Sequence, residues 1–291
     1  MSKGVMYMMV ATLFFALMNV CVKLLPHIPA VEIVFFRSIA TLVLSYAFLK
    51  KGNIPIWGNN KKLLLLRGIT GSISLILYFR LMQEIPLASA NVLVFLAPIF
   101  TTIMGIFLNN EKVTWVQWIF FAMSFAGVVF IRGFDARITN FDLLLGILAS
   151  LTSAMAFNII RKLNTSEHPL VIMMYFPMVT LPFTGIFCLF HWTTPVGTDW
   201  LVLLAVGILT HIAQLYMTKA YQQDEVSKVS SVRYLGILYA LGFGYIFFDE
   251  HFNWAVYAGM ALVLLGVVLN VWYKHAMLKR DESIYKEKLY N

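Results

Sequence analysis

Apolar stretches long enough to cross a bilayer recur along most of this chain. Hydrophobic residues fill 60% of the 291 positions and charged residues only 12%. A helix crosses the hydrocarbon core with about 20 apolar residues. The sequence therefore predicts an all-α integral membrane protein with ten transmembrane helices and no separate soluble domain. The predicted spans are 4–25, 30–49, 63–83, 86–108, 113–131, 142–161, 169–190, 199–221, 226–248 and 253–273. Pro98, Pro177 and Pro182 lie inside spans and predict kinks.

The positive charges gather on one side of the predicted bilayer. Sixteen of the 22 lysines and arginines, with Arg67 among them, fall on one side, and four fall on the other. Arg37 and Arg233 lie within spans. The positive-inside rule places the richer side, and with it both termini, in the cytoplasm. There the cations meet anionic lipid headgroups, so the net charge of +8 indicates the lipid bilayer as a partner and no nucleic acid.

The two halves of the sequence resemble each other when one is shifted by 139 residues. The superposed pairs include Asn19 with Asn158, Lys23 with Lys162, Gly68 with Gly207, Glu111 with Glu250 and Trp115 with Trp254. Each half contains five spans, an odd number, so the second half enters the membrane from the opposite side. The sequence therefore predicts two inverted repeats, 1–139 and 140–278, followed by a cytoplasmic tail, 279–291. Inverted repeats are typical of secondary transporters, whose substrate site lies near the midplane between them.

Several segments resemble the EamA-type repeats of the drug/metabolite transporter superfamily. They are "EIVFFRS" at 32–38, "LRGITG" at 66–71, "IPLASANVLVFLAPIFTTIMGIFLNNEKVTWVQW" at 85–118, and the "AGVV" and "LGVV" endings of the two halves. The resemblance implies a central cavity lined by the first four helices of each half, with the fifth and tenth helices at the periphery. It leaves the cargo open, because the superfamily carries chemically diverse metabolites.

We expect a transporter and no enzyme, because no nucleophile is set beside a base and no phosphate-binding loop is present. We also expect no metal and no cofactor. We expect the protein to work as a monomer or homodimer in the inner (plasma) membrane of a bacterium.

Arg37 and Arg233 are the charges that most need an explanation. An arginine near the bilayer centre costs roughly 2.5 to 3.5 kcal/mol on insertion scales, so it persists only where it faces a partner or water. Arg233 lies about two turns from the cytoplasmic end of its span, and Arg37 lies about as deep from the outer side. Glu32 precedes Arg37 by five residues, which places the two on different faces of one helix. A partner on another helix or a bound substrate would satisfy each guanidinium.

Other polar and aromatic side chains complete the candidate substrate site. His211 falls near the middle of the eighth span, where a lone histidine can also be a core residue. Asn19 and Asn158 occupy equivalent repeat positions, compatible with a gate, a hinge or a hydrogen bond between helices. The remaining candidates could line a cavity or pack between helices: Gln214, Tyr78, Asn91, Tyr175 and Tyr234.

The acidic residues narrow the mechanism. All 14 Asp and Glu lie at helix ends, in loops or in the tail, which disfavours a proton or sodium relay on a buried carboxylate. The charge inside the spans is cationic and predicts a small metabolite with a carboxylate or phosphate group. The alternatives are a neutral or zwitterionic metabolite, a cationic drug or, in another class, a membrane-embedded lipid-modifying enzyme. Such an enzyme would need Asp, Glu or His clustered at one membrane face, and the sequence has no such cluster.

The charge asymmetry predicts that the loop 50–62 is cytoplasmic and the loop 132–139 is external. In a chain with Cys21 and Cys188 replaced by serine, a membrane-impermeant thiol reagent added to intact cells should label a single cysteine at Ala136. It should not label one at Pro55, because the bilayer shields it. The reverse labelling pattern would invert the assignment.

Overall fold

The structure is a computed structural model that describes residues 2–109, 113–163, 166–223 and 232–290. Within these ranges it is helical, with no strand. Nine segments of the described chain are long and apolar enough to cross a membrane, and a shorter apolar helix lies in the ninth predicted span. The all-α membrane architecture is thus confirmed. The helices are α1 Lys3–Lys23, α2 Ala30–Lys51, α3 Lys61–Glu84, α4 Leu87–Val94, α5 Ala97–Asn109, α6 Trp115–Phe134, α7 Asn140–Leu163, α8 Pro169–Phe190, α9 Asp199–Gln223, α11 Leu235–Phe248 and α12 Trp254–Tyr290.

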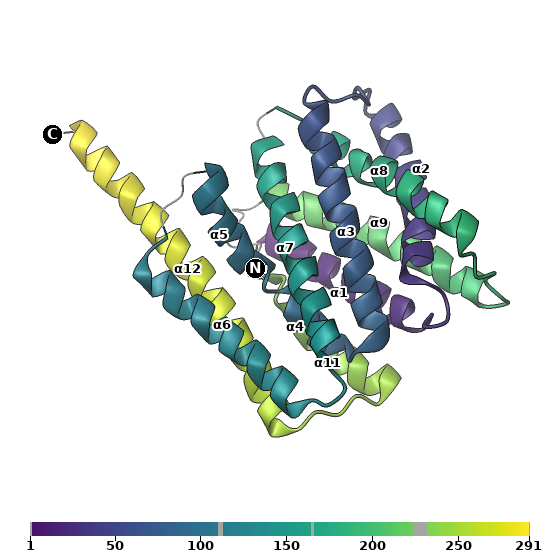
Figure 1. Ribbon diagram of the computed structural model, residues 1–291. Helices are drawn as coiled ribbons and strands as arrows, with labels where there is room; N and C mark the ends of the chain where they lie inside the picture. Colours follow the sequence, from purple (N-terminus) through teal and green to yellow (C-terminus); the bar gives the residue numbers. More distant parts are fainter. Residues whose placement is uncertain (1, 110–112, 164–165, 224–231, 291) are drawn as a thin grey trace.

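The helices of the two sequence halves interleave in one bundle. α1 packs along α9, α3 packs along α7, and α2 packs along α8, so each of these pairs joins one half to the other. α4 and α11 contact each other. Helix α8 continues through both Pro177 and Pro182, and α2 and α3 pack along it. Figure 1 shows α2 and α8 at one side of the bundle and α6 and α12 at the other.

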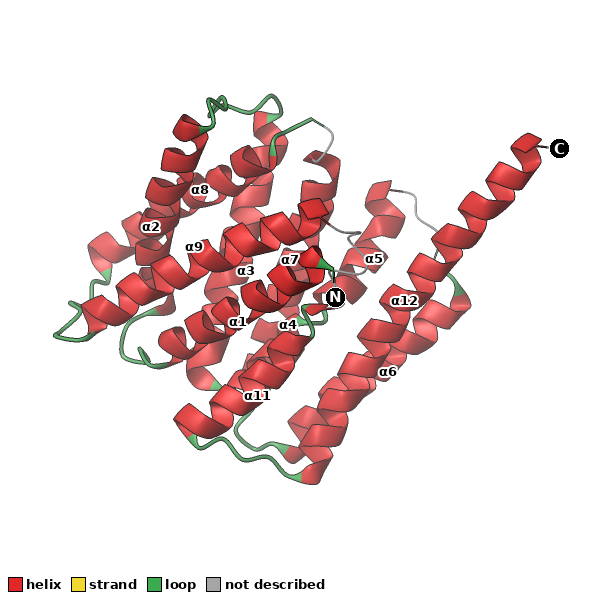
Figure 2. Cartoon of the chain, turned by 180° about the vertical axis from the view of Figure 1, so that it is seen from behind, coloured by secondary structure: helices red, strands yellow, loops and turns green. Residues whose placement is uncertain are grey.

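The fourth predicted span, 86–108, is divided into two helices instead of being merely kinked. α4 ends at Val94 and α5 begins at Ala97 (Figure 2). Pro98 causes the break, because it has no N–H for the Val94 carbonyl and its ring disfavours helical geometry just before it. The Leu93 carbonyl at the break lies 2.7 Å from the Ser150 hydroxyl of α7. The same carbonyl accepts from the Leu96 N–H at 3.2 Å, so backbone and side chain together satisfy it at the break.

The ninth predicted span, 226–248, also differs from a single helix in its described part. α11 begins at Leu235, and Arg233 lies in the turn that precedes it. The expectation that Arg233 lies inside a helix is therefore wrong. Tyr234 and Leu235 correspond, under the 139-residue shift, to Phe95 and Leu96 between α4 and α5. Residues 224–231 lie outside the described residues.

Helices α6 and α12 pack on each other at the periphery, as the family resemblance implies. The Ser124 hydroxyl of α6 lies 3.4 Å from the Val263 carbonyl of α12. Gly127 and Gly259 let the two backbones come close, because a Cβ on Gly127 would lie 2.6 Å from the Gly259 carbonyl oxygen. The helix continues to Tyr290, so most of the predicted tail is the end of α12 (Figure 1).

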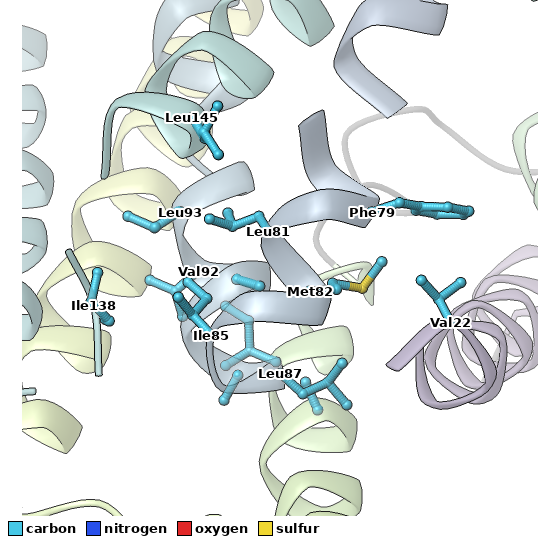
Figure 3. Packing of buried hydrophobic residues seen from close by; sticks show 14 of the residues in the cluster. Val22, Phe79, Leu81, Met82, Ile85, Leu87, Val92, Leu93, Ile138 and Leu145 are labelled. Carbon is cyan, nitrogen blue, oxygen red and sulfur yellow. The ribbon is translucent and has the colours of Figure 1, made fainter. Parts of the chain in front are cut away.

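The main apolar core lies where α1, α3, α4 and α11 meet. Figure 3 shows side chains of α3 and α4 interleaving there, with Val22 of α1 facing Met82. Phe79, Met82 and Leu87 are fully buried. Each such side chain contributes about 1.5–3 kcal/mol when taken from water. The core therefore fixes the ends of α3 and α4, which carry the polar residues described below.

The close approach of α6 and α12 predicts that Gly127→Ala destabilises the fold. The new methyl group would meet backbone atoms of Gly259 and Val263, so one helix must shift away from the other. Overpacking of this kind costs about 1–3 kcal/mol. Gly133→Ala on the same helix is the matched control, since nothing lies within 4 Å of its Cβ. Thermal unfolding of the purified protein in detergent measures both; equal midpoints for the two variants would contradict the prediction.

Candidate functional site

Three predicted site residues form one hydrogen-bonded chain across α1, α3 and α4, here called the tyrosine network. The Asn19 amide donates to the Tyr78 hydroxyl at 3.0 Å, and this hydroxyl donates to the Asn91 side-chain oxygen at 2.8 Å. The Asn91 amide donates in turn to the Leu87 carbonyl at 2.8 Å. Within the described part of the chain, the Asn19 side-chain oxygen has no hydrogen-bond partner. The network therefore joins three helices and still offers one acceptor.

Arg233 lies near the tyrosine network, in the turn before α11. Its guanidinium carbon is 5.6 Å from the centre of the Phe157 ring on α7, a distance typical of a cation–π contact. It is also close enough to Tyr78 to interact with it electrostatically. Among the described residues, no carboxylate pairs with Arg233. The half-buried guanidinium thus has aromatic neighbours and no counterion there.

Arg37 lies in a different place, between α2, α3, α8 and α9. Its Nε donates to the Thr210 hydroxyl at 3.0 Å, and its guanidinium lies 5.7 Å from the Phe79 ring and 5.6 Å from the Phe176 ring. The side chain is buried, yet its Nη1 has no partner among the described residues. Glu32 does not reach it; that carboxylate accepts from the backbone N–H of Thr193. Arg37 and Arg233 therefore belong to separate clusters.

Arg67 is the site residue that the sequence analysis missed. The charge pattern groups Arg67 with the cytoplasmic cations, but this residue lies on α3 with its Nε and Nη1 buried and unpaired within the described residues. Its guanidinium carbon is 4.9 Å from the centre of the Phe176 ring, on which Arg37 also lies. Arg67 lies inside the predicted span 63–83, and this position distinguishes it from cations in the loops. The nearby Lys61 and Lys62 made it look like part of a loop cluster.

His211 and Asn158 contact other parts of the bundle. His211 on α9 stacks on Phe48 of α2 at 5.4 Å, with both ring nitrogens unpaired among the described residues. Gln214 follows it on the same helix. The buried Asn158 amide contacts the Thr101 carbonyl of α5 and the Ala154 carbonyl of its own helix, each at 3.1 Å.

The two remaining predicted tyrosines lie in different surroundings. Tyr175 is buried in a second apolar cluster that includes Leu64 and Leu163. The Tyr234 ring lies 5.4 Å from the Phe95 ring at the break between α4 and α5. Tyr234 is therefore next to Arg233 and in contact with the divided fourth span.

An ion pair joins the end of α1, the end of α3 and the start of α4, the three helices of the tyrosine network. Lys23 Nζ lies 2.6 Å from the Glu250 carboxylate and donates to the Ile85 carbonyl at 2.6 Å. The backbone N–H of Leu87 donates to the same carboxylate at 3.0 and 2.9 Å. Glu250 precedes its own helix α12 in the sequence, yet its carboxylate complements the start of α4. Its repeat counterpart, Glu111, lies outside the described residues.

These features define the class of protein. A bundle of membrane-spanning helices carries buried polar side chains at its centre, and within the described residues no cluster of three or more His, Cys, Asp or Glu could hold a metal ion. Polar side chains inside a bundle of membrane-spanning helices are typical of transporters. Residues 2–133 and 140–272 each match the EamA-like transporter family. The chain belongs to this family and is a transporter of the drug/metabolite superfamily, not an enzyme.

Two relatives support this assignment, and one solved structure shows the same fold. The chain is 27% identical over 92% of its length to the pseudopaline exporter CntI of Pseudomonas aeruginosa (strain UCBPP-PA14), and the match covers 95% of that protein. It is 26% identical over 68% of both chains to the S-adenosylmethionine uptake transporter of Rickettsia felis. A crystal structure of 18% sequence identity superposes with a TM-score of 0.63, covering 94% of this chain and 98% of the other, which shows the shared fold.

The tyrosine network predicts that Tyr78→Phe destabilises the protein. Removal of the hydroxyl leaves the Asn19 amide and the Asn91 oxygen without their shared partner, at a cost of about 1–3 kcal/mol. Tyr46→Phe is the control, because Tyr46 is exposed on α2. Thermal unfolding in detergent should give a lower midpoint for Tyr78→Phe only. A wild-type midpoint for this variant would mean that the network contributes no stability.

Proposed function

We propose that this protein is a secondary transporter that moves a small anionic metabolite by alternating access, through exchange or down a gradient. One observation carries the proposal. Arg37 and Arg233 lie among aromatic rings inside the bundle, and no carboxylate of the described residues pairs with either. A cation in such surroundings is costly unless a counterion reaches it. The anionic group of the cargo would be that counterion.

We also propose that the two halves are inverted repeats related by a pseudo-two-fold axis. Three contacts support this proposal, because each joins a residue to its own counterpart 139 positions later. They are Arg37 with Phe176, Phe95 with Tyr234, and Ser124 with Val263. A residue contacts its own symmetry mate only close to the axis. The packing partners agree with this relation, since α1 on α9 corresponds to α7 on α3.

Such an arrangement suits alternating access. Rocking of one repeat against the other exposes a site on the axis to each side in turn. The Lys23–Glu250 pair links α1 and the start of α4 to the second half, so it would have to separate when the predicted outer end opens. The relatives include one named as an exporter and one named for uptake, so their names indicate transport without fixing its direction.

The alternative cargo is a neutral or zwitterionic metabolite or a cationic drug. The relative named for S-adenosylmethionine uptake keeps this alternative open. The two arginines disfavour a cation, because each would repel it. A thermal-shift screen of the purified protein against metabolites separates the cargo classes, since a ligand that binds the folded state raises its apparent stability.

Arg233→Gln should lower transport of the cargo found in this way. Loss of a charged hydrogen bond reduces uptake at low cargo concentration by about ten- to hundred-fold. Arg233→Lys should lie between the wild type and Arg233→Gln, because lysine keeps the charge without the bidentate geometry. Arg80→Gln is the control: Arg80 is exposed on α3 and pairs with Glu84. Uptake into liposomes is the measurement, and full transport by Arg233→Gln would leave Arg233 with a structural role only.

A further inference from the structure

We propose that Arg37 and Arg67, which both lie against the Phe176 ring, form one binding site for an oxyanion, a carboxylate or phosphate group. This site is separate from Arg233. The inference deepens the proposed function, because it names the residues that would hold the anionic group of the cargo, but it is tested independently of transport.

The geometry brings the two guanidiniums to one aromatic ring. The guanidinium carbon of Arg37 lies 5.6 Å from the centre of the Phe176 ring and that of Arg67 lies 4.9 Å from it. The two side chains come from different helices, α2 and α3, and Phe176 comes from α8. Gly71 leaves room for the ring, since a Cβ there would lie 3.1 Å from Phe176 and 3.5 Å from Arg67 Nη1. Side chains from three helices therefore meet at the Phe176 ring.

The electrostatics of this arginine pair are unbalanced. The two cations are close enough to repel each other, and no carboxylate of the described residues lies within ion-pair distance of either. Like charges buried together are unfavourable, and each buried ion also loses hydration. An anion between them would offset both costs at once. The Lys23–Glu250 ion pair shows how a half-buried cation is otherwise accommodated in this bundle.

The hydrogen-bonding capacity of the pair is also incomplete. Three guanidinium nitrogens are buried without a partner among the described residues: Nη1 of Arg37, and Nε and Nη1 of Arg67. A buried donor without a partner is unfavourable, because it has given up its hydrogen bonds to water. Thr210 accepts from Arg37 Nε and so orients this guanidinium while Nη1 remains available. Planar guanidinium groups match the oxygens of carboxylate and phosphate.

The site is distinct from the surroundings of Arg233. Arg233 contacts Phe157 and lies near Tyr78, whereas Arg37 contacts Phe79, the next residue of α3. Arg37 and Phe176 are also repeat counterparts, which puts the anion site close to the proposed pseudo-two-fold axis. A group bound there would touch elements of both halves, because α2 and α3 belong to the first half and α8 to the second.

Binding of inorganic phosphate to the purified full-length protein tests the inference. Thermal unfolding is followed in detergent as phosphate replaces chloride at constant ionic strength. The wild type should show a saturable rise in the unfolding midpoint. Arg67→Gln and Arg37→Gln should weaken the apparent affinity for phosphate by about ten- to hundred-fold. Arg80→Gln, on the same helix as Arg67 but exposed and paired with Glu84, should respond as the wild type does.

Further arms keep the test decisive. If the glutamine variants do not fold, Arg37→Lys and Arg67→Lys retain the charge and should still bind phosphate more weakly than the wild type. Phosphatidylglycerol added in place of phosphate separates a lipid headgroup from a free anion. A midpoint rise with the lipid, lost in the Arg67 variants, would assign the site to a lipid headgroup, whereas a rise with phosphate alone would assign it to a free anion. No phosphate response in the wild type, or a wild-type response in both Arg67 variants, would overturn the site. Full transport by Arg233→Gln would refute the proposed role of Arg233 in transport. It would leave the outcome of the phosphate-binding test at Arg37 and Arg67 unchanged.

Discussion

The hydrocarbon core of a bilayer offers no partner to a polar group, and this constraint organises the whole bundle. Hydroxyl groups inside the helices satisfy it locally; Thr12 and Thr41, for example, donate to carbonyls four residues earlier in their own helices. Lys23 satisfies it with Glu250 and a backbone carbonyl. Arg37 and Arg67 keep unpaired nitrogens in the described structure. Because most polar groups inside the bundle have a hydrogen-bond partner, the buried groups without one mark candidate binding positions.

The divided spans follow from the same constraint. A helix can end inside the membrane only where its backbone groups find partners within the protein. At the break between α4 and α5, the Leu93 carbonyl accepts from the Ser150 hydroxyl and from the Leu96 N–H. The turn before α11 falls at the corresponding place in the second half, and Phe95 and Tyr234 from the two places contact each other. Side chains near these breaks, such as Asn91 and Arg233, therefore come from short helices and turns at the centre of the bundle.

The sequence predicted the residues of the tyrosine network but not how they connect. Asn19, Tyr78 and Asn91 were identifiable as polar side chains within spans, and their approach depends on the packing of α1, α3 and α4. Tyr175 and Asn158 had the same sequence signal, yet one lies in an apolar cluster and the other bonds to backbone carbonyls. Residue type and depth cannot separate these cases, because the face that a side chain presents depends on its neighbours.

The sequence by itself determined the membrane class, the positions of the spans and the family, because apolar length, charge placement and local motifs are properties of consecutive residues. It could not determine which charges share a site. Arg37 and Arg67 are 30 positions apart and Phe176 is far from both, and only the packing of α2, α3 and α8 brings them together. Tertiary structure decided this point, since the interaction of two buried charges depends on their separation in space and on whether a counterion lies nearby.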